Sequence, residues 1–139
     1  MICCKNNSGS VLIKKIIHSP KAPVAAGPYS QAVLLHNTLY VSGQIPLNPL
    51  KGELVTGAFQ NQVQQVMRNL QHVLNEAGMD FTDVLRTTVY LTKIKHYNIF
   101  NDVYSTYFTD HYPARSLVEV AALPGKAAVM IDLIASKEN

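Results

Sequence analysis

A stripe of apolar residues between Phe59 and Ala77 is the feature that most restricts how this chain can fold. Apolar side chains recur there at spacings of three and four, with polar residues between them: Phe59, Val63, Val66, Met67, Leu70, Val73, Leu74 and Ala77. This spacing predicts an amphipathic helix of about five turns. Gly78 stands where a glycine commonly ends a helix.

Short segments rich in aliphatic, β-branched and aromatic residues flank this helix and predict strands. The expected strands are residues 11–17, 32–35, 38–42, 84–91, 116–121 and 127–135. The second and third are expected to pair across the His36-Asn37 turn, and 84–91 to be central in the sheet. A second apolar stripe predicts a helix from Tyr97 to Phe108, before the break at His111-Tyr112-Pro113. The order βββαβαββ indicates an α+β domain in which two helices cover one face of a single sheet.

The other face of that sheet is expected to be buried in an oligomer. Hydrophobic residues make up 47% of the chain and charged residues only 15%, so the surface is thinly charged. Two helices are enough to cover one face of the sheet only. An apolar second face therefore predicts contact with sister subunits.

The length of 139 residues accommodates one domain, which we place at residues 11–139. Residues 1–10 are polar and contain Gly and Ser, so we expect a disordered extension. Its adjacent cysteines, Cys3 and Cys4, are expected to be reduced thiols because neighbouring residues do not readily close an unstrained disulfide.

Several classes of partner are disfavoured by composition and spacing. Twelve basic and nine acidic residues give a net charge of +3, but the basic residues are scattered, which argues against a nucleic-acid partner. The five histidines lack metal-ligand spacing, so no metal is expected. The start of the chain does not resemble a signal peptide, and no stretch approaches 18 apolar residues. We therefore expect a cytoplasmic protein without a membrane partner.

Four segments in this order resemble the Rid (reactive intermediate deaminase, YjgF-like) family. They are residues 22–32 (APVAAGPYSQA), 41–46 (VSGQIP), 86–89 (RTTV) and 113–120 (PARSLVEV). Four ordered motifs are far more specific than any one of them. The resemblance implies a chorismate-mutase-like fold and a homotrimer with a barrel-like centre and three clefts between subunits. It also implies hydrolysis of reactive 2-imino acids and enamines to 2-oxo acids and ammonia, without a cofactor.

Arg115 is the main candidate for substrate binding and catalysis. It follows Pro113-Ala114 at the start of an apolar strand, where the chain has little local reason to carry a charge. The guanidinium fork matches a carboxylate bidentately. A solvated arginine, or an ion pair with Glu119 or Asp132, is the alternative. In the Rid family the matching arginine holds the substrate carboxylate, so the resemblance favours the functional role.

Four further residues are weaker candidates for the same site. Tyr29, in the turn Gly27-Pro28-Tyr29, has a ring and a hydroxyl suited to the edge of a cleft, or is simply half-buried in a turn. Ser42 and Gly43 offer a hydroxyl and an uncovered backbone N–H close to a ligand, or merely end a strand. Asn101 resembles a family position near the cleft.

The last strand departs from the family pattern. The family typically reads Glu-x-Glu-x-Ile-Ala there, whereas this chain has Met130 and Asp132 at the two acidic positions. A thioether can neither accept a proton at neutral pH nor polarise a water. Asp132 lies on the same strand face, but one period-2 step is roughly 6 to 7 Å and Asp is shorter than Glu. Met130 is expected to point into the same cleft as Arg115.

This departure separates two hypotheses. The first is a slow imine deaminase that relies on Arg115 and Tyr29, with Asp132 or a substrate group handling protons. The second is a non-catalytic or regulatory module that keeps the carboxylate anchor. A ribonuclease or translation inhibitor, as reported for some family members, is a third, disfavoured because no catalytic His/Lys constellation or basic stripe is visible.

Overall fold

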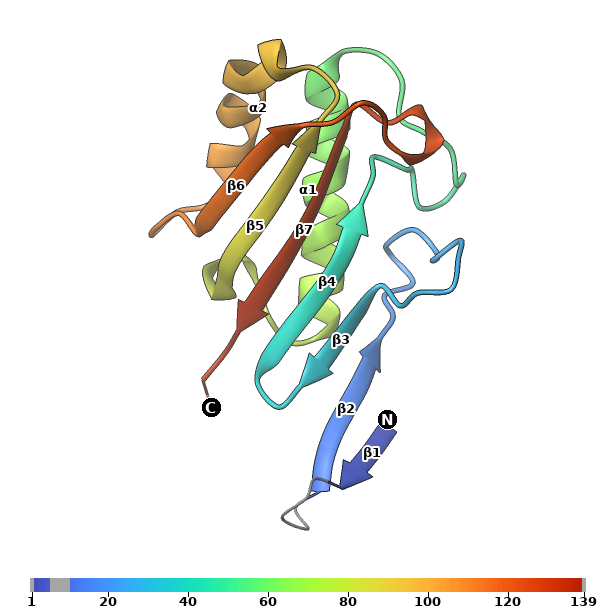
Figure 1. Cartoon of the computed structure of the whole chain (residues 1–139), viewed down its shortest axis with the longest axis vertical. Helices are drawn as coiled ribbons and strands as arrows, with labels where there is room; N and C mark the ends of the chain where they lie inside the picture. The colour runs from blue at the N-terminus through green and yellow to red at the C-terminus, as the bar shows by residue number, and fades with distance from the viewer. Residues whose placement is uncertain (1, 6–10, 139) are drawn as a thin grey trace.

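The computed structural model describes residues 2–5 and 11–138. Seven strands form one sheet in the order β1-β2-β3-β4-β7-β5-β6, and both helices lie on one face of it (Figure 1). The elements are β1 Ile2–Lys5, β2 Val11–Ile17, β3 Ala32–Leu35, β4 Thr38–Gln44, α1 Phe59–Glu76, β5 Val84–Leu91, α2 Tyr97–Tyr104, β6 Ala114–Glu119 and β7 Val129–Ser136. From β2 onward this is the predicted βββαβαββ order, which confirms the α+β fold class.

The N-terminal segment differs in part from the expectation. Residues 2–5 form β1, which pairs antiparallel with β2, so the structure gives this part a strand where a disordered extension was expected. Residues 1 and 6–10 of the expected extension lie outside the described residues.

Helix α1 ends as its sequence predicts. Its last turn closes at Ala77, and Gly78 follows with a φ of +74°, a conformation that favours glycine. The backbone N–H of Gly78 donates to the carbonyl of Asn75, and that of Met79 to the carbonyl of Leu74, both at 2.9 Å. These two bonds make a Schellman motif, which satisfies carbonyls that the helix end would leave unpaired.

Helix α2 is shorter than predicted and passes into a tighter turn over Ser105–Tyr107. The hydroxyl of Ser105 donates to the carbonyl of Asp102 at 3.2 Å, and that of Thr106 to the carbonyl of Val103 at 2.7 Å. Such short-range bonds from Ser and Thr side chains compete with regular helical pairing. These bonds end the α-helix at Tyr104, although the apolar spacing in the sequence continues to Phe108.

The core lies between the helices and the sheet, and β7 shows how the strands divide their side chains. Val129, Ile131, Leu133 and Ala135 are at most 2% exposed, and α1 packs against β4 and β7. The alternate residues of β7, which include Met130 and Asp132, are only partly buried. Because successive side chains of a strand point to opposite faces, these alternate residues lie on the face without helices, here called the open face.

The open face carries apolar side chains in register across several strands. Ile16 pairs with Val33, Val33 with Tyr40, and Tyr40 with Ile134, which makes one row across four strands. Tyr40 is 50% exposed and Ile16 42% exposed.

Within the described residues, neither helix is long and apolar enough to cross a membrane.

Candidate functional site

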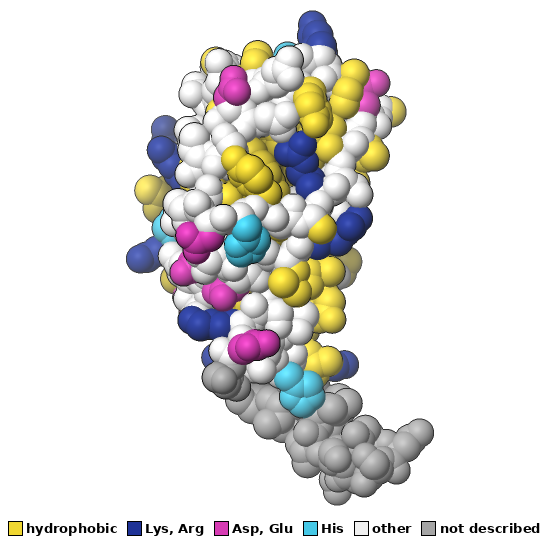
Figure 2. All heavy atoms as spheres, turned by 90° about the vertical axis from the view of Figure 1, so that its left-hand side faces the viewer, with side chains coloured by type: hydrophobic (Ala, Val, Ile, Leu, Met, Phe, Trp, Pro, Cys, Tyr) yellow, Lys and Arg dark blue, Asp and Glu magenta, His cyan; other side chains and the backbone are white. Residues whose placement is uncertain are grey.

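Strand register places Arg115 on the helix face of the sheet. Arg115 is on the edge strand β6, where it pairs with Thr87 of β5. The Thr87 side chain is buried, and its hydroxyl lies 2.8 Å from the hydroxyl of Tyr104 on α2. Directly paired residues share a face, so the Arg115 side chain emerges beside α2. Hydrophobic side chains gather around a basic one on this edge of the molecule (Figure 2).

Side chains of α2 hold the Arg115 guanidinium. One nitrogen, Nη1, donates to Oδ1 of Asn101 at 2.9 Å, and Nη2 donates to the hydroxyl of Tyr97 at 3.3 Å. Its central carbon lies 5.1 Å from the ring centre of Tyr104 and 5.7 Å from those of Tyr97 and Phe100. Aromatic faces attract a cation without neutralising it. The positive charge is thus fixed in place and remains free for an anion.

The alternative ion pairs for Arg115 are not formed. Oε1 of Glu119 accepts from the backbone N–H of Ile94 at 2.9 Å. Oδ2 of Asp132 accepts from the Tyr90 hydroxyl at 3.1 Å. Within the part of the chain that the structure describes, the hydrogen bonds of Arg115 go to neutral groups only.

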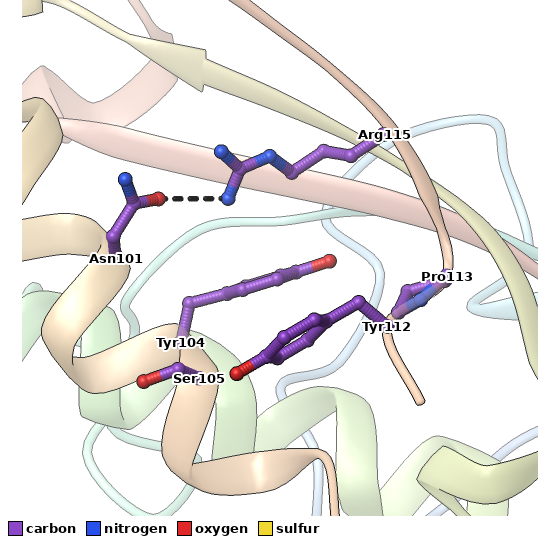
Figure 3. Close-up of a pocket in the computed structure, with 6 residues that line it drawn as sticks. All are labelled: Asn101, Tyr104, Ser105, Tyr112, Pro113 and Arg115. Atoms are coloured by element: carbon purple, nitrogen blue, oxygen red, sulfur yellow. Dashed lines mark hydrogen bonds between the residues drawn. The ribbon is translucent and has the colours of Figure 1, made fainter. Parts of the chain in front are cut away.

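Beside Arg115 the surface is hollowed by a cavity of about 350 Å³, here called the arginine pocket. It is lined by Asn101, Tyr104, Ser105, Tyr112, Pro113 and Arg115. The rings of Tyr104 and Tyr112 lie on the same side of the Arg115 guanidinium (Figure 3). Burial raises the pKa of the Tyr104 phenol, although the hydrogen bond with Thr87 and the charge of Arg115 act in the opposite direction. Tyr104 is therefore neutral at physiological pH.

Most of the other predicted residues meet at a second cavity, of about 270 Å³, here called the methionine pocket. Its lining residues are Tyr29, Ser42, Gly43, Ile45, Pro124, Met130 and Asp132. The structure thus brings Tyr29, Ser42, Gly43, Met130 and Asp132 together, and it brings Asn101 to Arg115. It does not bring the two groups to one pocket.

Ser42 does not offer the free donors that were expected of it. Its hydroxyl donates to the carbonyl of Ser30 at 2.7 Å, and its backbone N–H donates to the carbonyl of Gln31 at 2.9 Å. Both bonds tie β4 to the segment that carries Tyr29. The side chain of Ser42 therefore positions Tyr29 at the rim of the pocket, where that ring is 53% exposed.

Met130 packs closely against the backbone of Gly43. A Cβ atom at Gly43 would lie 2.8 Å from Sδ of Met130 and 3.1 Å from its Cγ. The first distance is shorter than real Cβ contacts and the second is tighter than most of them, so the Met130 side chain would have to move. The thioether therefore lies directly on the backbone of β4 and forms the floor of the methionine pocket.

Within one chain Met130 and Arg115 lie on opposite faces of the sheet, so their meeting in one cleft stays a prediction for a cleft between subunits. Arg115 pairs with Thr87 on the helix face, whereas Met130 pairs with Tyr90 and lies on the open face. Thr87 and Tyr90 are three residues apart on β5, and an odd separation along a strand puts side chains on opposite faces. A site that uses both pockets therefore needs two chains.

Three residues beside the candidate site residues were not predicted from the sequence: Tyr97, which accepts from Arg115, Tyr90, which donates to Asp132, and Tyr112, which lines the arginine pocket. Tyr97 lies four residues before Asn101 on α2, so helical spacing could have placed it beside the same guanidinium. Tyr112 directly precedes Pro113 and lies three residues before Arg115, so its nearness in the sequence could have indicated it. The bond between Tyr90 and Asp132 joins residues 42 apart and has no local sequence signal.

Among the described residues, no group of three His, Cys, Asp or Glu side chains is placed to hold a metal ion.

Comparison with known proteins identifies the family. The family model described as Endoribonuclease L-PSP matches residues 19–137. Human 2-iminobutanoate/2-iminopropanoate deaminase is 44% identical over 126 residues, which cover 91% of this chain and 92% of the relative. The crystal structure of YyfA, a protein of the conserved Rid family from Yersinia pestis, has a TM-score of 0.87 and 44% identity over 90% of this chain and 100% of that one. E. coli TdcF, solved with bound serine, has a TM-score of 0.85 and 36% identity over 89% of this chain and 99% of that one. The chain therefore belongs to the Rid (YjgF-like) family.

Proposed function

We propose that this protein is an imine deaminase, which hydrolyses small 2-imino acids or their enamine tautomers to 2-oxo acids and ammonia. The observation that carries the proposal is the arginine pocket. A guanidinium held by Asn101 and three aromatic rings, with no carboxylate bonded to it among the described residues, faces a cavity large enough for a small organic acid. The name and the 44% identity of the human relative support the same activity.

The chemistry requires little from the protein beyond placement. Arg115 binds the substrate carboxylate bidentately and so fixes the imine carbon. A water adds its oxygen to that carbon and loses a proton, the C–N bond breaks, and ammonia leaves as the carbonyl forms. Of the described residues lining the methionine pocket, Asp132 is the only carboxylate, so it is the group that can take the proton from water and return it to nitrogen.

We further propose a homotrimer with a barrel-like centre, in which the open faces are buried against each other. The exposed apolar rows on that face support burial, since a monomer would leave them in water. The opposite placement of the two pockets supports a shared site, in which the methionine pocket of one subunit completes the arginine pocket of another. The cytoplasmic location expected from the sequence stays a prediction.

A second function is favoured by one observation, the thioether of Met130 at the position of the family's usual glutamate. A protein with the anchor but without a strong base would bind small carboxylates and turn over slowly or not at all. Such a protein would serve as a binding or regulatory module.

Two measurements separate these functions. Ammonia release is followed from an imino acid generated in situ by an amino-acid oxidase, with and without the protein. Binding of pyruvate or 2-oxobutyrate is measured by calorimetry. Arg115→Lys should weaken binding by about tenfold or more, because a bidentate contact becomes a point charge. Arg68→Lys, at an exposed arginine of α1, is the matched control and should change nothing.

Unchanged affinity in Arg115→Lys would leave Arg115 with a structural role only. Binding without any acceleration of ammonia release would exclude the deaminase and support the binding module.

A further inference from the structure

One hydrogen bond on the open face involves neither Arg115 nor the residues that hold it. The hydroxyl of Tyr90 on β5 donates to Oδ2 of Asp132 on β7 at 3.1 Å. The register pairs Tyr90 directly with Met130, so Asp132 is its diagonal neighbour. Diagonal pairs are within reach of long aromatic side chains. The phenol therefore extends past the thioether to reach the carboxylate.

We propose that Tyr90 is a positioning residue, which orients the carboxylate of Asp132 for proton transfer. Asp132 would thereby replace the family's usual glutamate, whose position Met130 occupies. This inference rests on the proposed deaminase function. It adds a residue that neither touches the substrate nor lines either pocket.

The role of Asp132 as an acid-base group requires that its carboxylate be held but not neutralised. Arg86, the nearest cation along β5 on the open face, donates from Nη2 to the Ser116 hydroxyl at 2.9 Å. The donor that the structure gives Asp132 within the described chain is a neutral phenol. A salt bridge would strongly stabilise the carboxylate and so weaken it as a base. A phenol orients the carboxylate and stabilises its charge less.

The geometry also explains how a short side chain serves where the family has a longer one. Asp has one methylene fewer than Glu, and Asp132 lies one period-2 step from Met130. A hydrogen bond that fixes one carboxylate oxygen restricts the rotation of the side chain, which leaves the second oxygen to accept a proton from water. Burial and the hydrogen bond to Asp132 raise the pKa of the Tyr90 phenol, so the hydroxyl remains a donor through the neutral range.

Structural packing alone does not account for the hydroxyl. Tyr90 is only partly buried, and a phenylalanine would supply the same ring to the sheet. A hydrogen bond at a partly exposed site makes a modest contribution to stability, and many other pairs can supply such a contribution. The specific consequence of this hydroxyl is the orientation of the one described carboxylate in the methionine pocket.

The test is a double-mutant cycle on the full chain, with wild type, Tyr90→Phe, Asp132→Asn and the double variant. Steady-state imine hydrolysis gives kcat and KM, and calorimetry gives the affinity for pyruvate. Tyr90→Phe should lower kcat by about tenfold, since a hydrogen bond to a charged group is worth about 1.5 kcal/mol or more. The KM and the affinity for pyruvate should stay within about twofold, because Arg115 is untouched.

In the Asp132→Asn background, Tyr90→Phe should have little further effect, because the group that it orients is already gone. Tyr40→Phe is the matched control: it removes a tyrosine hydroxyl from the same open face, outside the methionine pocket, and should leave kcat unchanged. Circular dichroism and the oligomeric mass of each variant show that folding is equal.

Three outcomes overturn the proposal. A Tyr90→Phe variant with wild-type kcat removes the positioning role and leaves the deaminase intact. If Tyr90→Phe lowers kcat by the same factor in wild type and in Asp132→Asn, Tyr90 does not act through Asp132. A wild-type protein that binds pyruvate but releases no ammonia removes the proposed function itself and the positioning role with it.

Discussion

Replacement of Met130 by glutamate is the sharpest perturbation of the proposed site. Met130 is partly exposed, and its thioether lines the methionine pocket against Gly43. Its Sδ occupies the side-chain position that the carboxyl carbon has in glutamate. Glu is unbranched and of similar length, so it can follow the same path along β4. The variant would place a carboxylate where the family usually has one, beside Asp132.

The magnitude follows from what is already present. A positioned general base contributes about 10²- to 10⁴-fold, and Asp132 supplies part of that in the wild type. We therefore expect Met130→Glu to raise kcat by about 10- to 100-fold. Two carboxylates one period-2 step apart, roughly 6 to 7 Å, repel by about 0.6 kcal/mol in water and about 2.5 kcal/mol at an effective dielectric of 20. This repulsion favours the state in which one of the two carboxyl groups is protonated, which suits an acid-base pair.

The assay is ammonia release from an imino acid generated in situ, with the oligomeric mass confirmed by light scattering. Met130→Gln is the matched control, since it has the shape of Glu without the charge. Equal rates for the two variants would show that shape and not charge matters. A fall in rate with Met130→Glu, in a folded oligomer, would refute the assigned register or make the carboxylate dispensable.

Two further predictions concern the assembly and the stability of the chain. Light scattering should give a mass near three times the 15.3 kDa chain, and a monomer at micromolar concentration would contradict the shared site. Hydrogen bonds from the hydroxyl and backbone N–H of Thr82 lower the pKa of Asp80 below its usual 3.8, so its stabilisation is present above that value and is lost as the pH falls through the lowered pKa. Asp80→Ala should therefore cost about 0.5 to 1 kcal/mol in urea unfolding at pH 7, a modest value because Asp80 is exposed, and the difference from wild type should shrink below about pH 4. The two proteins are compared at equal concentration, and an unchanged difference at low pH would contradict a stabilising role of these hydrogen bonds.

The features that the sequence predicts correctly are those fixed by neighbours along the chain. The spacing of apolar residues determines α1, and Gly78 determines its end, because both depend on helical geometry within a few turns. The hairpin of β3 and β4 across His36 and Asn37 is likewise confirmed, with Leu35 paired to Thr38. Each of these depends on contacts between residues that are close along the chain.

The features that were missed depend on pairing between distant segments. Whether Arg115 and Met130 share a face is set by how β6 and β7 each align with β5, and one residue of register reverses the answer. The sequence gives the alternation within each strand but not the alignment between strands. For the same reason the donors of Ser42 looked free, although the segment before β3 takes both of them.

The separation of the two pockets bears on how this family member could lose a glutamate and keep its chemistry. The anchor of Arg115 depends on α2 and β6, whereas the acid-base group depends on β4, β5 and β7, so no side chain is shared between the two tasks. A change at Met130 therefore leaves the anchor undisturbed. With Met130 in place of the glutamate, Asp132 is the carboxylate that remains among the described residues of the methionine pocket, and it accepts a hydrogen bond from Tyr90. If turnover depends on this pair, its loss should change kcat alone, and the affinity for 2-oxo acids should report Arg115 alone.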